Sequence, residues 1–101
     1  MKAVKVEYTV RPEYVDTNKA NIKKVMDRLR EHPIDGMMYS SYTKDDGQTF
    51  VHINICRDQE TMSRLGELPE FNEFQKALKA SGPVSPPQAS KLDLVAAGFD
   101  I

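Results

Sequence analysis

The sequence lacks tryptophan and has one cysteine and two histidines among its 101 residues. The single cysteine, Cys56, excludes an internal disulfide and fits a reducing compartment better than secretion. Cysteine and histidines are scattered, so the sequence has no metal-ligand spacing. No apolar stretch approaches the roughly 20 residues of a membrane span, and the amino terminus has no signal-peptide pattern. We therefore expect a cytoplasmic protein that does not associate with membranes.

The sequence also has no large excess of positive or negative charge, because 14 basic residues are balanced by 15 acidic ones and the net charge is −1. No run of Lys or Arg stands apart from acidic residues, which argues against binding to nucleic acid. The sequence has no glycine-rich phosphate loop and no G-x-S-x-G elbow. The length predicts a single domain over residues 1–101. So short a chain has a marginal core, which association with a second copy would supplement.

The first elements are marked by the period of their apolar residues. Strict alternation from Val4 to Val10 predicts a strand, which ends at Arg11-Pro12 because proline cannot donate to a ladder. A helix follows, beginning between residues 13 and 17, where Asp16 or Thr17 can cap it, and ending at His32-Pro33. Its apolar stripe comprises Ile22, Val25, Met26 and Leu29.

A hairpin is the next predicted element, with strands over 37–43 and 49–56 and a turn around Asp46-Gly47. A two-residue loop would place Tyr39 opposite Asn54 and Thr43 opposite Phe50. A four-residue loop would keep the same faces, whereas a three-residue loop with a bulge would exchange the faces of one strand relative to the other.

The second half of the chain reads as two helical stretches and a strand. Asp58 can cap a short helix that runs to Leu65, and Pro69 suits the first turn of another helix, which Gly82-Pro83 ends. The apolar stripe of that helix comprises Phe71, Phe74 and Leu78. A proline-rich connector over 83–90 precedes a last strand predicted over 91–97.

This βαββαβ order predicts a ferredoxin-like α+β fold, with a four-stranded antiparallel sheet and the helices on one face. The expected strand order is fourth, first, third, second, with the first and third strands as parallel central neighbours. We expect the helices to cover the apolar side of the first strand together with Val51, Ile53 and Ile55. The opposite, open face would then present Lys5, Glu7, Thr9, Arg11, Met37, Tyr39, Ser41, Thr43, Phe50, His52, Asn54 and Cys56.

An open face of this composition has two interpretations. It is either an ordinary solvent-exposed sheet face, or an apolar patch that a second copy of the chain covers. The second interpretation predicts a homodimer with a ligand cavity between two facing sheets. Phe50, Met37, Tyr39 and Cys56 favour it, because their apolar surface needs a cover.

Nearly the whole chain resembles the dimeric α+β barrel superfamily, and within it the antibiotic-biosynthesis-monooxygenase-like branch. The resemblance is carried by the first strand closing at Arg11-Pro12, by the Asp46-Gly47 hairpin, and by the segment 68–71 followed by Phe74. It implies a ferredoxin-like protomer that pairs with a second copy. Members include cofactor-free oxygenases that act on electron-rich aromatic rings, and haem-degrading enzymes.

The resemblance also bears on the choice between these activities. The oxygenases of this family often use an asparagine with a tryptophan, and its haem-degrading enzymes add a histidine on a helix. This chain has no tryptophan, His32 falls at the end of the first helix, and the second helical region has no histidine. Haem degradation is therefore disfavoured, and no cofactor or metal is expected. Asn54 is an available asparagine.

His52 is the first candidate for catalysis. It could act as a general base if Glu7, on the neighbouring strand, held its imidazole. Tyr39, Asn54 and Arg11 would then hold the resulting substrate anion.

The same side chains have plainer interpretations. His52 would be a hydrogen-bonded interface residue, Glu7 and Arg11 solvated or ion-paired charges, and Tyr39 and Asn54 a structural pair. Phe50 would supply apolar contact to either a ligand or a second copy. We expect Cys56 to be buried and inert. The leading functional hypothesis is a cofactor-independent monooxygenase acting on a small aromatic or quinone-like substrate; the alternative is a non-catalytic binding or assembly module.

Overall fold

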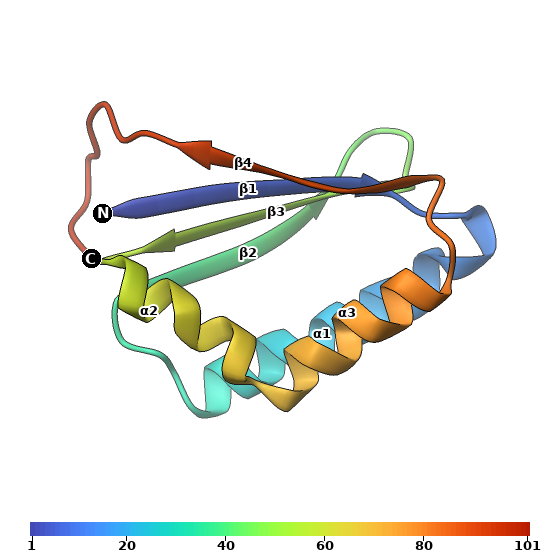
Figure 1. The fold of residues 1–101 in the computed structure, drawn as a ribbon, viewed down its shortest axis with the longest axis horizontal. Coiled ribbons are helices and arrows are strands. Elements are labelled where there is room, and N and C mark those ends of the chain that lie inside the picture. Colours follow the sequence, from blue (N-terminus) through green and yellow to red (C-terminus); the bar gives the residue numbers. More distant parts are fainter.

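The computed structural model describes all 101 residues and has the βαββαβ order (Figure 1). Short 3₁₀ turns, η1 and η2, precede α1 and α3. The elements are β1 (Lys2–Thr9), η1 (Pro12–Tyr14), α1 (Val15–Glu31), β2 (Met37–Thr43), β3 (Thr49–Cys56), α2 (Gln59–Ser63), η2 (Arg64–Glu67), α3 (Pro69–Ala80) and β4 (Ser85–Leu92). No helix is long and apolar enough to cross a membrane.

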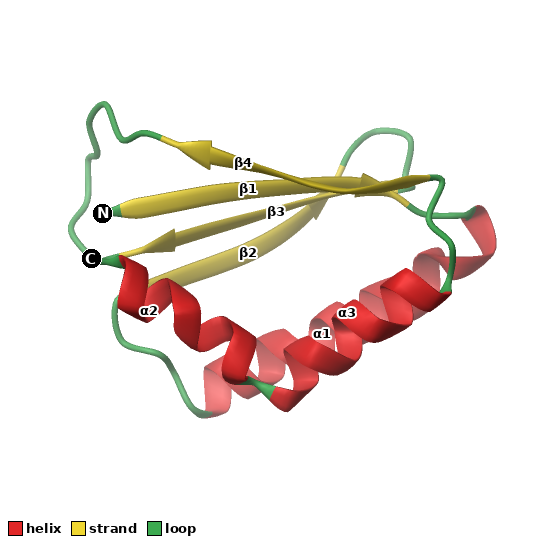
Figure 2. Ribbon diagram, in the orientation of Figure 1, coloured by secondary structure: helices red, strands yellow, loops and turns green.

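The four strands form one sheet in the order β2-β3-β1-β4, as predicted, and the helices lie together on one side of it (Figure 2). All neighbouring strands are antiparallel, so the prediction that β1 and β3 are parallel was wrong. The crossover through α1 makes β1 and β2 run in the same direction with β3 between them. Since β3 returns from β2 through a hairpin, it runs opposite to both.

The register of the hairpin is the predicted one, with Tyr39 opposite Asn54 and Thr43 opposite Phe50. Its loop is longer than the two-residue turn, because the last hydrogen bond between the arms joins Lys44 N to Thr49 O at 2.8 Å. The four residues 45–48 therefore form the loop. Asp46 holds its shape, since its carboxylate accepts hydrogen bonds from Gln48 N, Thr49 N and Thr49 Oγ1.

The predicted facing of β3 relative to β1 was wrong. The β1–β3 register places Val6 opposite His52 and Tyr8 opposite Phe50, so these residues share a face. That face lies under the helices, where Phe50 is 1% exposed and His52 4%. The aliphatic residues of β3 that were expected to meet the helices, Val51, Ile53 and Ile55, lie half-buried on the open face.

Packing explains why the helices cover the face of β3 that combines apolar and polar residues. This mixed face carries Phe50, His52, Asn54 and Cys56. The rings of Tyr8 and Phe50 stack with centroids 5.6 Å apart, and both join one hydrophobic core with residues of α1, η2 and α3. This core consists of Tyr8, Val10, Val25, Phe50, Leu65, Phe74 and Leu78. Large aromatic rings bury more apolar surface than the smaller aliphatic side chains, and the polar groups of Tyr8 and His52 beside them are hydrogen-bonded to each other.

The helix boundaries follow the local signals in part. Asp58 caps α2 by accepting a hydrogen bond from Thr61 N at 2.8 Å, and Pro69 occupies the first turn of α3. At α1, neither Asp16 nor Thr17 is the cap, because the preceding 3₁₀ turn leads directly into a helix that begins at Val15.

Strand β4 spans Ser85–Leu92, earlier than the predicted strand over 91–97. Pro86 and Pro87 lie inside it, which is tolerated because the outer N–H groups of an edge strand have no partner and because the pairing with β1 is interrupted at these two residues. The pairing of β4 with β1 shifts register between Glu7 and Thr9. The proline-rich segment is thus part of the sheet, and it borders the space between the sheet and α3.

Shortening Leu78 to alanine tests this core. Leu78 is 3% exposed, so Leu78→Ala should lower the free energy of unfolding by about 2–5 kcal/mol through lost burial and a cavity. Lys76→Ala, on the exposed side of the same helix, should change it by less than about 0.5 kcal/mol. Urea unfolding monitored by circular dichroism measures both, and equal effects would contradict the assignment of the core.

Candidate ligand-binding site

A cavity of about 650 Å³ lies between the sheet and the helices α2 and α3. Residues of β1, β2 and β3 form one wall, residues of α2, η2 and α3 form the other, and Pro83, Pro86 and Pro87 complete the rim. Gln75, Lys79 and the two β4 prolines on the lining are exposed. The cavity therefore opens to solvent between β4 and α3.

The sheet wall of this cavity holds a hydrogen-bonded histidine. His52 Nε2 lies 2.7 Å from the hydroxyl oxygen of Tyr8, and His52 Nδ1 lies 2.7 Å from that of Tyr39. Asn18 Nδ2, on α1, donates to the Tyr8 hydroxyl at 2.9 Å. Both ring nitrogens of His52 are thus occupied, and the three aromatic side chains come from three neighbouring strands.

Burial sets the protonation of these groups. The imidazole packs among aromatic rings, with centroid distances of 5.3 Å to Tyr8, 5.7 Å to Tyr39 and 5.4 Å to Phe74. Desolvation lowers the pKa of His52 to about 4, so the imidazole is neutral at pH 7. Desolvation also raises the pKa of Tyr8 and of Tyr39, and both phenols remain protonated.

Asn54 is the other polar residue on the sheet wall. Its Oδ1 accepts a hydrogen bond from Cys56 Sγ at 3.3 Å, while its amide nitrogen makes no hydrogen bond within the chain. Asn54 lies directly opposite Tyr39 across the hairpin, so the two side chains are neighbours on the wall. Burial raises the pKa of the Cys56 thiol, which disfavours the reactive thiolate.

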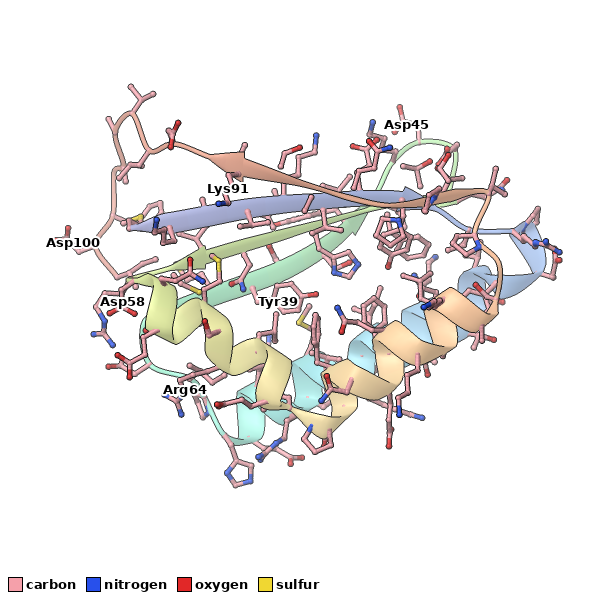
Figure 3. All side chains as sticks on the ribbon, in the orientation of Figure 1. Tyr39, Asp45, Asp58, Arg64, Lys91 and Asp100 are labelled. Carbon is pink, nitrogen blue, oxygen red and sulfur yellow. The ribbon has the colours of Figure 1, made fainter.

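The structure brings together only some of the predicted site residues. Tyr39, His52 and Asn54 line the cavity, and Figure 3 shows Tyr39 between the sheet and the helices. Phe50 lies in the core against Tyr8 rather than on the lining. The cavity itself lies within one chain and not between two facing sheets, because the mixed face of β3 is the one under the helices.

Glu7 and Arg11 lie away from this cavity. Glu7 is opposite Val51 and not beside His52, so the expected carboxylate–imidazole contact does not form. Its carboxylate instead contacts Lys44 Nζ at 2.9 Å and Lys5 Nζ at 3.3 Å on the open face. Arg11 Nε donates to the carbonyl oxygen of Gly82 at 3.0 Å, which ties the end of β1 to the end of α3.

Two residues of the network, Tyr8 and Asn18, were not predicted as site residues. Tyr8 was assigned to the helix side of β1, where it does lie, but as core. Asn18 had a signal in the sequence, because it precedes Ile22, Val25 and Leu29 by four, seven and eleven residues and so continues the apolar stripe of α1. A polar residue at such a position is 0% exposed here and needs a buried partner.

The lining carries few groups that could hold a charged cofactor. Lys79 is the one cationic residue on it, at the exposed rim. No three His, Cys, Asp or Glu side chains anywhere in the chain are grouped so that they could hold a metal ion. The arrangement can bind a mostly apolar molecule and offer it a small number of uncharged hydrogen-bonding groups.

Comparison with solved structures places this fold. A structure described as an antibiotic biosynthesis monooxygenase superimposes with a TM-score of 0.81 at 16% identity, covering 95% of this chain and 100% of the other. Rv0793 from Mycobacterium tuberculosis gives 0.83 at 17%, with 97% and 98% covered. SnoaB from Streptomyces nogalater, a cofactor-independent oxygenase, gives 0.73 at 14%, with 98% and 97% covered.

No protein-family model and no curated protein matches the sequence. The likeness is therefore one of backbone architecture, and it extends over nearly the full length of both partners in each comparison. It confirms the ferredoxin-like α+β fold expected from the order of elements and from the resemblance. The chain shares its backbone fold with solved structures described as antibiotic biosynthesis monooxygenases.

Proposed function

We propose that this protein binds a small aromatic or quinone-like molecule in the cavity between its sheet and its helices, and that it is a cofactor-independent monooxygenase. The observation that carries the proposal is an apolar cavity whose sheet wall holds Tyr39, His52 and Asn54. A concave apolar site with a few convergent polar groups is the usual form of a small-molecule site. The fold shared with SnoaB, a cofactor-independent oxygenase, supports the choice of reaction.

The reaction can proceed without an external reductant because the substrate supplies the electrons. One quinol and one O₂ combine to form one hydroxylated quinone and one water. The quinol loses a hydroxyl proton to solvent water, the anion bonds to O₂ at a ring carbon, and the peroxide takes up a proton to give a hydroperoxide. The ring carbon then loses its hydrogen as a proton, and the O–O bond breaks as water leaves. Hydrogen bonds from the sheet wall to the substrate oxygen would stabilise the anion.

The geometry limits the role of His52 in this reaction. Each of its nitrogens already has a tyrosine hydroxyl 2.7 Å away, and an imidazole with a pKa of about 4 is a weak base at pH 7. We infer that His52 acts through Tyr39 rather than by taking the substrate proton itself. The same observation favours a second candidate function, a binding protein that holds the ring molecule without turning it over.

We further propose that the open face of the sheet forms a homodimer interface. The apolar residues on this face now differ from those expected, and they are Ala3, Met38, Tyr42, Val51, Ile53, Ile55 and Leu92. Met38 is 50% exposed and Tyr42 55% in the isolated chain. A contiguous exposed apolar patch of this kind is typical of a protein interface, and a two-fold pairing of identical patches would bury it.

Oxygen consumption with a panel of quinols tests the catalytic proposal. Wild-type protein should accelerate oxygen uptake above autoxidation, and Tyr39→Phe should lower kcat about 100-fold by removing a hydrogen bond to the anion. Tyr42→Phe, the same change on the open face, should have no effect. Saturable binding of the quinol without any turnover would support the binding function instead, and absence of both would refute the use of this cavity.

The neutral state of His52 predicts a pH dependence of stability. Its pKa is about 4 in the folded chain and about 6.5 unfolded, so the unfolded state binds more protons between these values. The free energy of unfolding should therefore fall as the pH is lowered from 6.5 to 4, by up to about 3 kcal/mol.

Urea unfolding at several pH values measures this slope. The range from 6.5 to about 5 isolates His52, because the carboxylates with lowered pKa, Glu7, Asp46 and Asp58, lose their contribution at more acidic pH. His52→Gln should flatten the slope, and His32→Gln, at an exposed position, should retain it. A flat wild-type profile would show that His52 is not held neutral.

A charge on the open face should disrupt the proposed dimer. Ile53→Lys places an ammonium group at the centre of the apolar patch, where its desolvation would oppose association. Light scattering coupled to gel filtration should give twice the chain mass for wild type and for Asn72→Lys, on the exposed side of α3, and one chain mass for Ile53→Lys. A wild-type protein with the mass of one chain would refute the dimer.

A further inference from the structure

Four side chains form a single line of hydrogen bonds that starts on α1 and ends at the cavity. Asn18 Nδ2 contacts the Tyr8 hydroxyl at 2.9 Å, this hydroxyl contacts His52 Nε2 at 2.7 Å, and His52 Nδ1 contacts the Tyr39 hydroxyl at 2.7 Å. Asn18 is not part of the cavity lining, whereas Tyr8, His52 and Tyr39 are. Within this line, a change at Asn18 reaches Tyr39 only through Tyr8 and His52.

The proton of the Tyr8 hydroxyl determines which group donates and which accepts in each hydrogen bond of this line. Tyr8 is 2% exposed, so its O–H needs an acceptor within the chain. Of its two partners, Asn18 Nδ2 is a donor only, and His52 Nε2 is the remaining group that can accept. His52 is neutral and carries one ring proton, which must then be on Nδ1.

The protonation of His52 also determines the role of the Tyr39 hydroxyl. Because His52 Nδ1 carries the proton, it donates to the oxygen of the Tyr39 hydroxyl. That hydroxyl has no other hydrogen-bond partner in the chain, and its own hydrogen is free to point into the cavity. The amide nitrogen of Asn54 is a second donor without a partner, and it lies opposite Tyr39 on the adjacent strand. Directly opposed side chains have Cβ atoms about 5 Å apart.

We propose that Asn18 is a positioning residue that sets the His52 tautomer, and that Tyr39 and Asn54 form a pair of donors for one oxygen of the ligand. The ligand oxygen is an acceptor, as in a ring carbonyl or a phenolate anion, and not a hydroxyl that donates. This assignment rests on the proposed function, since it names the oxygen chemistry of the ring molecule that the cavity holds. If the Asn18 amide were turned so that its oxygen accepted from Tyr8, the donor and acceptor of every hydrogen bond in the line would be exchanged. Tyr39 would then donate to His52 and could only accept a hydrogen bond from the ligand.

The tautomer is measured directly by nitrogen-15 NMR of the imidazole rings in the ligand-free protein. The two ring nitrogens differ in chemical shift according to which carries the proton, and His32→Gln assigns the signals because the chain has two histidines. We expect the Nδ1-protonated form for His52 at pH 7. An Nε2-protonated ring would overturn the donor assignment.

The role of Asn18 is tested in the same spectrum. Asn18→Asp replaces the amide donor to Tyr8 with a carboxylate oxygen that accepts, so the Tyr8 hydroxyl can donate to it and the Nε2-protonated form of His52 should appear. Asn72→Asp, the same change at an exposed position on α3, should leave the spectrum unchanged. A folded Asn18→Asp protein with an unchanged His52 tautomer would show that Asn18 does not set it. The wild-type spectrum decides the donor assignment even if Asn18→Asp fails to fold.

Ligand binding tests the pair of donors with two probes that differ by one oxygen, the aryl ketone α-tetralone and its deoxygenated counterpart tetralin. Tyr39→Phe should weaken binding of α-tetralone about 2- to 12-fold, the effect of one hydrogen bond, and leave tetralin unaffected. Asn54→Leu should act on the same probe. Equal effects on both probes, or no effect on the ketone, would overturn the assignment.

The two sets of measurements separate this inference from the proposed function. If the wild-type protein binds neither probe, the proposed function and the ligand assignment both fail, whatever the tautomer. If the ketone binds but His52 is protonated on Nε2, only the donor assignment fails. The hydroxyl-bearing probe α-naphthol should bind more weakly than its phenolate, and a preference for the protonated phenol would also contradict the donor pair.

Discussion

The structure depends on the burial of a neutral histidine between two tyrosine hydroxyls. An imidazole is costly to bury unless both of its nitrogens find partners, and here one partner comes from each neighbouring strand. This arrangement commits the mixed side of β3 to the helices. It leaves the aliphatic side of β3 on the open face, so the cavity and the exposed apolar patch are two results of the same choice.

Much of the fold followed from local patterns in the sequence. The strand order and the hairpin register were predicted, because the Asp46-Gly47 turn fixes which residues of the two arms are opposite. The facing of β3 was not, because its two sides are both apolar enough to be core. Aliphatic alternation at Val51, Ile53 and Ile55 pointed to the wrong side, and the register between β1 and β3 is a long-range property that no short-range signal specifies.

The candidate site was predictable to the extent that one hairpin carries it. Tyr39, His52 and Asn54 share a face in any hairpin with an even loop, so they remained together although that face lies on the other side of the sheet. Glu7 and Arg11 were grouped with them by the error in facing. Asn18 was missed because its partner, Tyr8, is ten residues away on a different element, and a buried polar residue is recognised only when its partner is known.

The two prolines in β4 have a consequence for how this sheet can grow. Without N–H groups, Pro86 and Pro87 weaken the ladder that β4 could offer to a further strand. The opposite edge, β2, has no proline between Met37 and Thr43. Misassembly through strand addition is therefore more favourable at β2, and this is the edge that most needs protection.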